Sequence, residues 1–242
     1  SVRKNQEKRP LPHQPDRFDR SRLQLGSLAD RRHLVHVSDL PAAGQADASF
    51  EHPALPVLAD AVAGARAAGR GVLMMIGAHV IKQGMGRYVA AWLRNGWIDV
   101  LAMNGACAIH DYELARIGAT SESVAENIRD GRFGLWRETG ELNDIVAAGS
   151  ARGLGLGEAV GQSIATGSLP HADVSVFAAA HESSAVATVH VSIGYDILHE
   201  LPNFDPAATA EASYRDFLTF AGAVERLEGG AVLSFGSAVM AP

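Results

Sequence analysis

The chain has 242 residues, of which 47% are hydrophobic and 20% charged, and its formal net charge at pH 7 is −6. This balance is that of a globular protein, and the negative charge argues against a protein that binds nucleic acid through the phosphates. No apolar run reaches the roughly 18–20 residues that cross a bilayer, and no apolar signal core follows the N-terminus. The single cysteine, Cys107, excludes an internal disulfide. We therefore expect a cytoplasmic protein that binds neither membranes nor nucleic acid.

The first 20 residues are too polar to bury much surface, because they hold nine charged side chains and three prolines. We predict that residues 1–30 form a mobile arm or a strap over a neighbouring subunit, and that residues 31–242 form a single α/β domain. A basic arm that binds an anionic partner is the alternative interpretation.

The first half of the domain contains a strand–helix–strand pattern. Alanine and valine recur at helical spacing from Pro56 to Gly69, which predicts a helix. The apolar run at 71–80 (GVLMMIGAHV) is typical of a parallel strand that is buried on both faces. A second helix is expected over 84–95 and a second buried strand over 97–106 (WIDVLAMNGA). Together the two strands and the helix between them predict a right-handed βαβ unit.

The second half continues the alternation of helices and strands. Residues 111–157 are expected to be mostly helical, and Ser123 with Glu126 has the spacing of a capping box. The glycine-rich segment 152–161 lacks the spacing of the dinucleotide fingerprint, so it predicts a turn and a helix without a phosphate site. The remaining expected elements are a strand at 187–194, a helix at 210–227 and a strand at 229–240. This order predicts a doubly wound α/β fold with a mostly parallel sheet.

Small and polar residues follow each predicted strand. The four strand ends are Gly77–Ala78–His79, Asn104–Gly105–Ala106, Gly194–Tyr195–Asp196 and Gly236–Ser237–Ala238. In open parallel sheets, ligands bind outside the carboxyl ends of the strands, and small residues let the backbone approach a ligand closely. A glycine after a strand is usually only a turn, but four such ends together predict a shared cleft.

Three histidines lie at or just beyond these strand ends: His79, His110 and His199, with Asp111, Glu113 and Asp196 nearby in the sequence. Histidine with a carboxylate can serve acid–base catalysis or bind a metal, or each histidine can simply cap a turn. Lys82 can hold a phosphate or act as a desolvated nucleophile, or it can be a solvated surface residue. Cys107 is interpreted as a small buried residue and His190 as a core histidine.

Three segments resemble deoxyhypusine synthases in the expected order. Residues 77–111 (GAHVIKQGMGRYVAAWLRNGWIDVLAMNGACAIHD) resemble the early βαβ segment of that family. Residues 188–200 (TVHVSIGYDILHE) and 228–240 (EGGAVLSFGSAVM) look like two later strands. The resemblance covers about half of the chain. It implies a Rossmann-like fold, a homotetramer with sites at subunit interfaces, and NAD used to oxidise spermidine before an aminobutyl group passes to a lysine.

By position, the resemblance implies a set of cofactor-binding residues. These are Ala78, His79, Lys82, Asn104, Gly105, Ala106, Asp196, Gly236 and Ser237. The sequence also departs from the family. Paired glutamates of the family fall on Ile109 and His110 here, and a second family aspartate falls on Leu201. Losing these carboxylates weakens the attraction for a polycation, so we expect a substrate other than spermidine. The family's catalytic lysine would lie beyond Pro242, and we expect the domain to be incomplete at this end.

These observations lead to one main hypothesis and two alternatives. The main hypothesis is an NAD-dependent transferase or oxidoreductase without a resident metal, acting on an amine (polyamine-like) or alcohol, with His110, His199 and Asp111 as catalytic residues. The first alternative is a metal-dependent hydrolase or lyase that uses His79, His110, His199 and Asp196. The second is a non-catalytic oligomer of the same fold.

Overall fold

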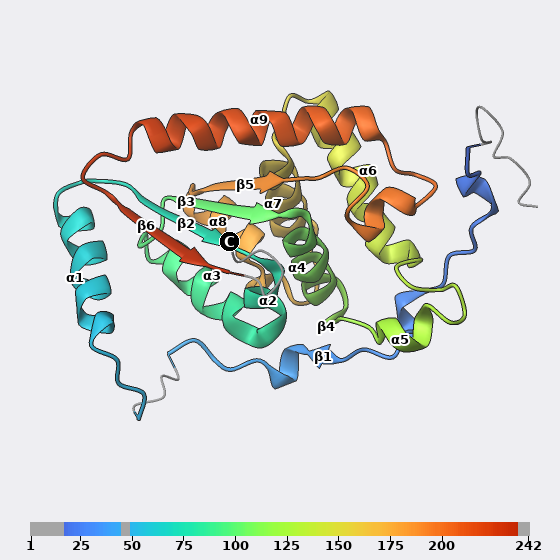
Figure 1. Ribbon diagram of the computed structural model, residues 1–242, viewed down its shortest axis with the longest axis horizontal. Coiled ribbons are helices and arrows are strands. Elements are labelled where there is room, and N and C mark those ends of the chain that lie inside the picture. Colours follow the sequence, from blue (N-terminus) through green and yellow to red (C-terminus); the bar gives the residue numbers. More distant parts are fainter. Residues whose placement is uncertain (1–16, 45–48, 237–242) are drawn as a thin grey trace, which may run out of the picture.

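The computed structural model describes residues 17–44 and 49–236. Its centre is a parallel sheet of four strands in the order β5-β3-β2-β6, which all point the same way in Figure 1. The strands are β2 (Val72–Ile76), β3 (Val100–Asn104), β5 (Val186–His190) and β6 (Ala231–Phe235). Counted along the chain, their spatial order is 3-2-1-4, which is the order of a Rossmann half-sheet. The predicted α/β fold with a parallel sheet is confirmed.

Helices connect and cover these strands. The elements up to β2 are η1 (Arg20–Arg22), η2 (Leu28–Asp30), β1 (Val35–His36), η3 (Val37–Asp39) and α1 (Ala54–Ala67). Those between β2 and β5 are α2 (Ala78–Val80), η4 (Ile81–Met85), α3 (Gly86–Arg94), α4 (Gly105–Ile117), β4 (Ala119–Thr120), α5 (Val124–Asn127), α6 (Arg137–Ala151), α7 (Leu156–Thr166), η5 (Ala172–Val174) and α8 (Val176–Ser183). After β5 come η6 (Ile197–Glu200) and α9 (Pro206–Glu225). No helix of the described part of the chain is both long and apolar enough to cross a bilayer.

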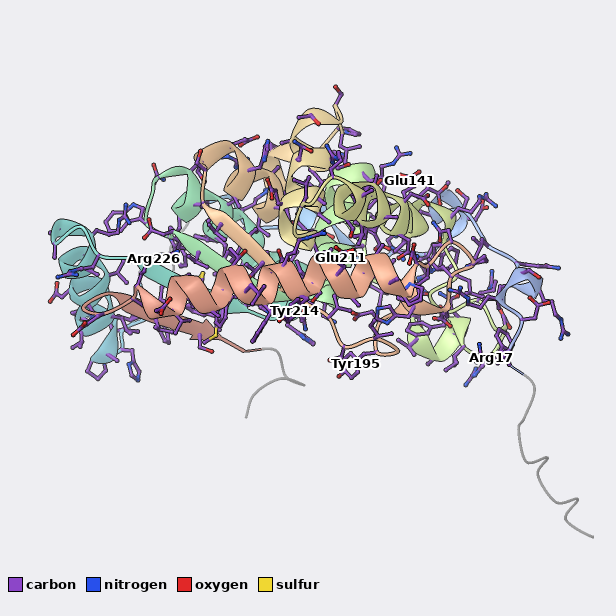
Figure 2. All side chains as sticks on the ribbon, turned by 90° about the horizontal axis from the view of Figure 1, so that it is seen from above. Arg17, Glu141, Tyr195, Glu211, Tyr214 and Arg226 are labelled. Carbon is purple, nitrogen blue, oxygen red and sulfur yellow. The ribbon has the colours of Figure 1, made fainter. Side chains whose placement is uncertain are left out.

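The core lies against one face of the sheet. Side chains that point to this face, such as Met74, Leu101 and Val189, pack with α3, α4, α7 and α8. On the other face α9 contacts β5 and β3, and Figure 2 shows it lying lengthwise across the molecule. The buried carboxylate of Asp216 fastens α9 in place, because it accepts hydrogen bonds from the backbone N–H groups of Gly157 (2.9 Å) and Val189 (2.7 Å).

The structure shortens the predicted strands and adds a small sheet. β2 ends at Ile76, so the last part of the run 71–80 is already helical. The reason is Gly77, which caps α2 at the point where the chain leaves the sheet. The antiparallel pair β1–β4 was not predicted, because two-residue strands leave no periodic pattern.

Residues 17–30 differ from the predicted mobile arm. Leu28 is fully buried, and its backbone N–H donates to Glu138 at 2.8 Å. The Arg20 guanidinium donates to the carbonyl oxygens of Leu201 (2.9 Å) and Phe204 (3.3 Å). This segment therefore packs on its own chain through polar contacts that a reading of apolar periodicity cannot find. Residues 1–16 of the predicted arm lie outside the described residues.

Candidate functional site

The carboxyl ends of the strands finish level with one another. In the register of the sheet, Ile76 of β2 lies opposite Met103 and Phe235, and Asn104 of β3 lies opposite His190. Two hollows open at this edge. The first, which we call the sheet hollow, has a volume of about 340 Å³ and lies among Gly77, Asn104, His190, Phe217, Phe220 and Gly236. The second, the histidine hollow, has a volume of about 280 Å³ and lies among Lys82, Ala106, His110, Glu113, Tyr195 and Asp196.

The sheet hollow occupies the point where the strand order reverses. Connections from β2 go to one side of the sheet through β3, and β6 returns on the other side. The backbone N–H of Gly77 donates to the carbonyl of Phe235 at 3.3 Å, so the ends of β2 and β6 are joined. A crevice at such a reversal is where open α/β sheets bind their ligands. Gly236 lines this hollow, and the predicted cofactor residue Ser237 lies outside the described residues.

The turn after β3 is fixed by Asn104 and Gly105. The Asn104 side chain caps α4 by accepting the backbone N–H of Cys107 at 3.2 Å. A Cβ atom on Gly105 would lie 2.1 Å from Oδ2 of Asp196, so only glycine lets this carboxylate reach the start of α4. Burial raises the pKa of Asp196 to about 6. Gly105 and Asp196 were predicted to line the same cleft, and in the structure the Asp196 carboxylate lies against Gly105.

Among the predicted catalytic residues, His110 has the hydrogen-bond partners best suited to acid–base chemistry. Its Nδ1 atom lies 2.8 Å from the hydroxyl of Thr120, which donates to Glu113 at 2.7 Å. Burial is the main reason that the pKa of His110 is lowered to about 4. Lys82, Arg31 and His79 act in the same direction, and Glu113 acts against them. The imidazole is consequently neutral at ordinary pH and lines the histidine hollow.

His199 organises the loop that carries Asp196. Its Nδ1 atom accepts the backbone N–H groups of Gly194 (3.1 Å) and Asp196 (3.0 Å), and its ring lies 4.7 Å from that of Phe204. Because Nδ1 is an acceptor twice over, the ring carries its proton on Nε2. Burial also lowers the pKa of this imidazole. The geometry favours a role for His199 in shaping the loop.

Asp111 does not face either hollow. It is fully buried, and its carboxylate accepts the hydroxyl of Ser175 and the backbone N–H groups of Val176 (2.9 Å) and Phe177 (3.4 Å). These are the donors at the start of α8, so Asp111 holds that helix against α4. The predicted catalytic role has no support in this geometry, because the side chain cannot reach a ligand at the strand ends.

Six of the predicted site residues line the two hollows. Lys82, Ala106, His110 and Asp196 share the histidine hollow, while Asn104 and Gly236 line the sheet hollow. In α2, Ala78 is buried and the neighbouring His79 is half-buried. Three residues that bind Glu113 were not predicted as site residues: Arg31, Thr120 and Thr139. Glu113 itself stands three residues after His110, and this helical spacing was a usable signal.

Within the described residues, no three His, Cys, Asp or Glu side chains are arranged to hold a metal ion. In particular, His199 uses Nδ1 for the loop, and His110 uses Nδ1 for Thr120. The metal-dependent alternative therefore lacks a ligand set in the part of the chain that the structure describes.

Comparisons with known proteins agree with the fold. No protein-family model matches the sequence, and a search of curated proteins finds no match. Among solved structures, the chain is similar to ArgZ, an arginine dihydrolase from the ornithine–ammonia cycle in cyanobacteria, with 18% identity and a TM-score of 0.50 over 78% of this chain and 26% of that one. It is also similar to unliganded AgrE, with 21% identity and a TM-score of 0.50 over 76% of this chain and 25% of that one.

The chain thus spans about a quarter of the length of ArgZ and AgrE. Identities this low show a shared fold alone, and that fold is a Rossmann-like α/β domain with a parallel sheet. AgrE has also been crystallised in a ternary complex with ornithine and NAD+.

The comparisons do not place the chain in the deoxyhypusine synthase family. A protein described as a deoxyhypusine synthase from Entamoeba histolytica matches at 8% identity, with a TM-score of 0.37 over 69% of this chain and 51% of that one. This similarity is too weak to assign the chain to that family. The lost carboxylates at Ile109, His110 and Leu201 are consistent with this correction.

Proposed function

We propose that this chain is an NAD-dependent enzyme that oxidises the carbon next to an amine nitrogen, as an oxidoreductase or as the first step of a group transfer. The observation that carries the proposal is the reversal of strand order between β2 and β6, with the sheet hollow directly at that point. AgrE, which shares the fold, is crystallised with NAD+.

The residues at the strand ends fit a dinucleotide. Gly77 and Gly236 carry no side chain, so a cofactor can approach the backbone closely there. The sheet hollow has an apolar wall that includes Phe217 and Phe220, which suits a planar ring. The residues that would hold NAD are Ala78, His79, Lys82, Asn104, Gly105, Ala106, Asp196, Gly236 and Ser237. When bound there, NAD would supply the hydride acceptor.

Asp196 and Lys82 would bind different parts of the ligands. The Asp196 carboxylate is half-buried and lies against the start of α4, where it can accept hydrogen bonds from ribose hydroxyls. Lys82 supplies positive charge in the histidine hollow for a phosphate or for an anionic end of the substrate. The neutral His110 supplies a proton acceptor between them.

A homo-oligomer with sites at subunit interfaces stays a prediction. Some large side chains of α9, including Tyr214 and Leu218, are more than half exposed. Burial of such side chains against a second copy would be favourable.

The experiment is calorimetric titration of the purified chain with NAD+, with the Asp196→Asn and Asp60→Asn variants beside the wild type. Asp60 is an exposed residue of α1, far from the strand ends, so it is the matched control. We expect NAD+ to bind the wild type and the control equally, and Asp196→Asn to bind about tenfold or more weakly, because a hydrogen bond to a charged group is lost.

Nucleotide content and turnover complete the test. We expect the wild-type protein to release NAD on denaturation or to bind NAD+ in the titration. Turnover is then measured as the formation of NADH in the presence of amines such as putrescine, spermidine and ornithine. A protein that neither binds NAD+ nor releases any nucleotide on denaturation overturns the proposal. Binding without NADH formation from any amine or alcohol would support the non-catalytic alternative instead.

A further inference from the structure

A chain of hydrogen bonds runs from a buried ion pair to the wall of the histidine hollow. It begins at Arg31, whose Nη1 and Nη2 atoms donate to the two carboxylate oxygens of Glu113 at 3.0 and 2.6 Å. It continues from Glu113 through the hydroxyl of Thr120 to Nδ1 of His110. Each link has a distance between 2.6 and 3.0 Å, so none is a loose contact.

The direction of each hydrogen bond follows from counting protons. Glu113 is ionised and can only accept, because Arg31 and the Thr139 hydroxyl (2.6 Å) both donate to it. The single hydroxyl proton of Thr120 is therefore given to Glu113. The Thr120 oxygen then has only lone pairs to offer, and His110 must place its proton on Nδ1 to bind it.

This arrangement leaves Nε2 of His110 without a proton. Within the part of the chain that the structure describes, no hydrogen bond occupies that atom. The ring lines a hollow of about 280 Å³, which is large enough for part of a small substrate. A carboxylate that fixes the tautomer of a histidine through hydrogen bonds is a recurring arrangement at proton-transfer sites.

Glu113 stays ionised although it is buried. Its side chain and that of Arg31 are 1% and 2% exposed, and Arg31 also lies 5.5 Å from the ring of Trp136. Hydrogen bonds from Arg31, Thr139 and Thr120 hold the pKa of Glu113 below its usual value and outweigh the effect of burial. A permanent negative charge thus lies one hydroxyl away from the imidazole, where it stabilises the imidazolium that forms when the ring takes a proton.

We propose that the histidine hollow is a proton-abstraction site in which Nε2 of His110 is the acceptor and Thr120 and Glu113 are positioning residues. One N–H bond of the protonated substrate amine breaks, its electron pair stays on nitrogen to give the neutral amine, and a new bond joins the proton to Nε2, which makes the ring an imidazolium. This inference rests on and deepens the proposed amine oxidation, because a protonated amine must become neutral before its neighbouring carbon can be oxidised.

The charged groups around His110 explain why the neutral ring is available at all ordinary pH values. Lys82 and His79 approach from the turn after β2, Arg31 from the N-terminal segment, and Glu113 from α4 itself. Asp196, from the loop after β5, lines the same hollow. Burial is the largest influence and keeps the pKa near 4, so no proton has to be removed from Nε2 before it can act.

The first test is the tautomer of His110 in nitrogen-15 NMR spectra of the whole chain, with no cofactor or substrate added. Thr120→Val removes the hydroxyl at nearly constant volume, and Thr120→Ser restores it. Thr219→Val, on the exposed side of α9, is the matched control. His110→Gln identifies the signal by its disappearance. We expect the Nδ1–H form in the wild type, in Thr120→Ser and in the control, and its loss in Thr120→Val.

The second test measures the reactivity of Nε2 with diethyl pyrocarbonate, an electrophile that acylates unprotonated imidazole. Tryptic cleavage after Arg94 and Arg116 gives the peptide 95–116, in which His110 is the sole histidine. Between pH 5.5 and 7.5 the rate for free histidine rises about tenfold. We expect the rate at His110 to stay nearly constant and to fall about fivefold in Thr120→Val, because the lost hydrogen bond no longer selects the tautomer.

The two proposals fail in different ways. An Nε2–H tautomer of His110 or a charged ring at pH 7 overturns the proposed proton-abstraction site. A Thr120→Val variant that keeps the wild-type tautomer and reactivity overturns it as well. Neither result depends on NAD. If the tautomer and reactivity are as expected while NAD+ does not bind, the proton-abstraction site stands and the choice of cofactor is wrong.

Discussion

The two sides of α4 use the same kinds of side chain for different purposes. His110 and Asp111 are neighbours in the sequence, yet His110 lines the histidine hollow and Asp111 is buried against α8. Glu113, one turn further on, is held ionised by Arg31. Asp111 has only neutral donors in contact, and burial raises its pKa to about 6. Both carboxylates are buried, and they differ because Glu113 has a cationic partner in contact whereas the contacts of Asp111 are neutral donors.

The comparison shows that the environment of a side chain, rather than its type, decides its chemistry. The hollow side has a guanidinium, an ionised carboxylate, two threonines and an imidazole in one connected network. The core side has a single carboxylate that caps a helix. Substitutions on the two sides should therefore differ in the size of their effect and in its dependence on pH.

The largest effect is expected from Arg31→Met. This change removes the cation and leaves the Glu113 carboxylate buried without a counter-charge, which costs about 3–5 kcal/mol of unfolding free energy. Arg32→Met is the control, because its side chain is 78% exposed and its ion pair with Glu126 is worth about 0–1 kcal/mol. Urea denaturation measures both variants. The double variant Arg31→Met/Glu113→Gln should recover part of the loss, and no recovery would show that the guanidinium acts mainly by packing on Trp136.

The next effect concerns pH and has opposite signs on the two sides of α4. His110 has a folded pKa of about 4, below the ordinary value of 6.5, so its contribution to stability is complete above pH 6.5 and is lost as the pH falls toward 4. Asp111 has a folded pKa of about 6, above the ordinary value of 3.8, so its contribution is complete below pH 3.8 and is lost as the pH rises through 6. Each contribution spans up to ~3 kcal/mol.

Variants separate these two contributions. We expect His110→Gln to flatten the loss of stability on acidification between pH 6.5 and 4, and Asp111→Asn to remove a loss of stability that occurs as the pH rises over a similar range. Unfolding free energies measured at several pH values give the two differences from the wild type. Differences of the same sign would contradict the assignment of a neutral imidazole to one side and a desolvated carboxyl to the other.

Much of the fold followed from the sequence because buried parallel strands have a simple pattern. The runs that became β2 and β3 are continuous and apolar, and each ends at a small or polar residue that begins a helix. The four predicted strand ends were expected to share one cleft. The structure has two hollows near this edge, and β5 ends at His190, so Tyr195 and Asp196 belong to the loop that follows it. Asp196 and Gly105 came from this rule of topology, without any motif.

The chain of hydrogen bonds from Arg31 to His110 could not be predicted in the same way. Arg31 precedes Glu113 by 82 residues, and Thr120 belongs to a two-residue strand that forms only when β1 pairs with β4. Neither residue has a periodic or spacing signal. The placement of Asp111 away from His110 has a related cause, because adjacent residues on a helix point in directions about 100° apart. Closeness in the sequence to His110 was therefore no evidence for a place in the same hollow.

The smallest effect, and the sharpest geometrically, is expected from Gly105→Ala. The added Cβ would lie 2.1 Å from Oδ2 of Asp196, so the carboxylate and the loop after β5 must move away from α4, at a cost of about 1–3 kcal/mol. The matched control is Gly64→Ala in α1, where nothing lies within 4 Å of the new Cβ. That change should stabilise the protein by about 0.5–1 kcal/mol, because alanine is the better helix former.

Thermal unfolding and NAD+ titration of both variants measure the outcome. Gly105→Ala should also weaken NAD+ binding, because Asp196 leaves the position from which it would contact the cofactor. If Gly105→Ala were as stable as the control and bound NAD+ normally, Asp196 would not need its contact with the start of α4, and the proposed cofactor site would have to exclude it.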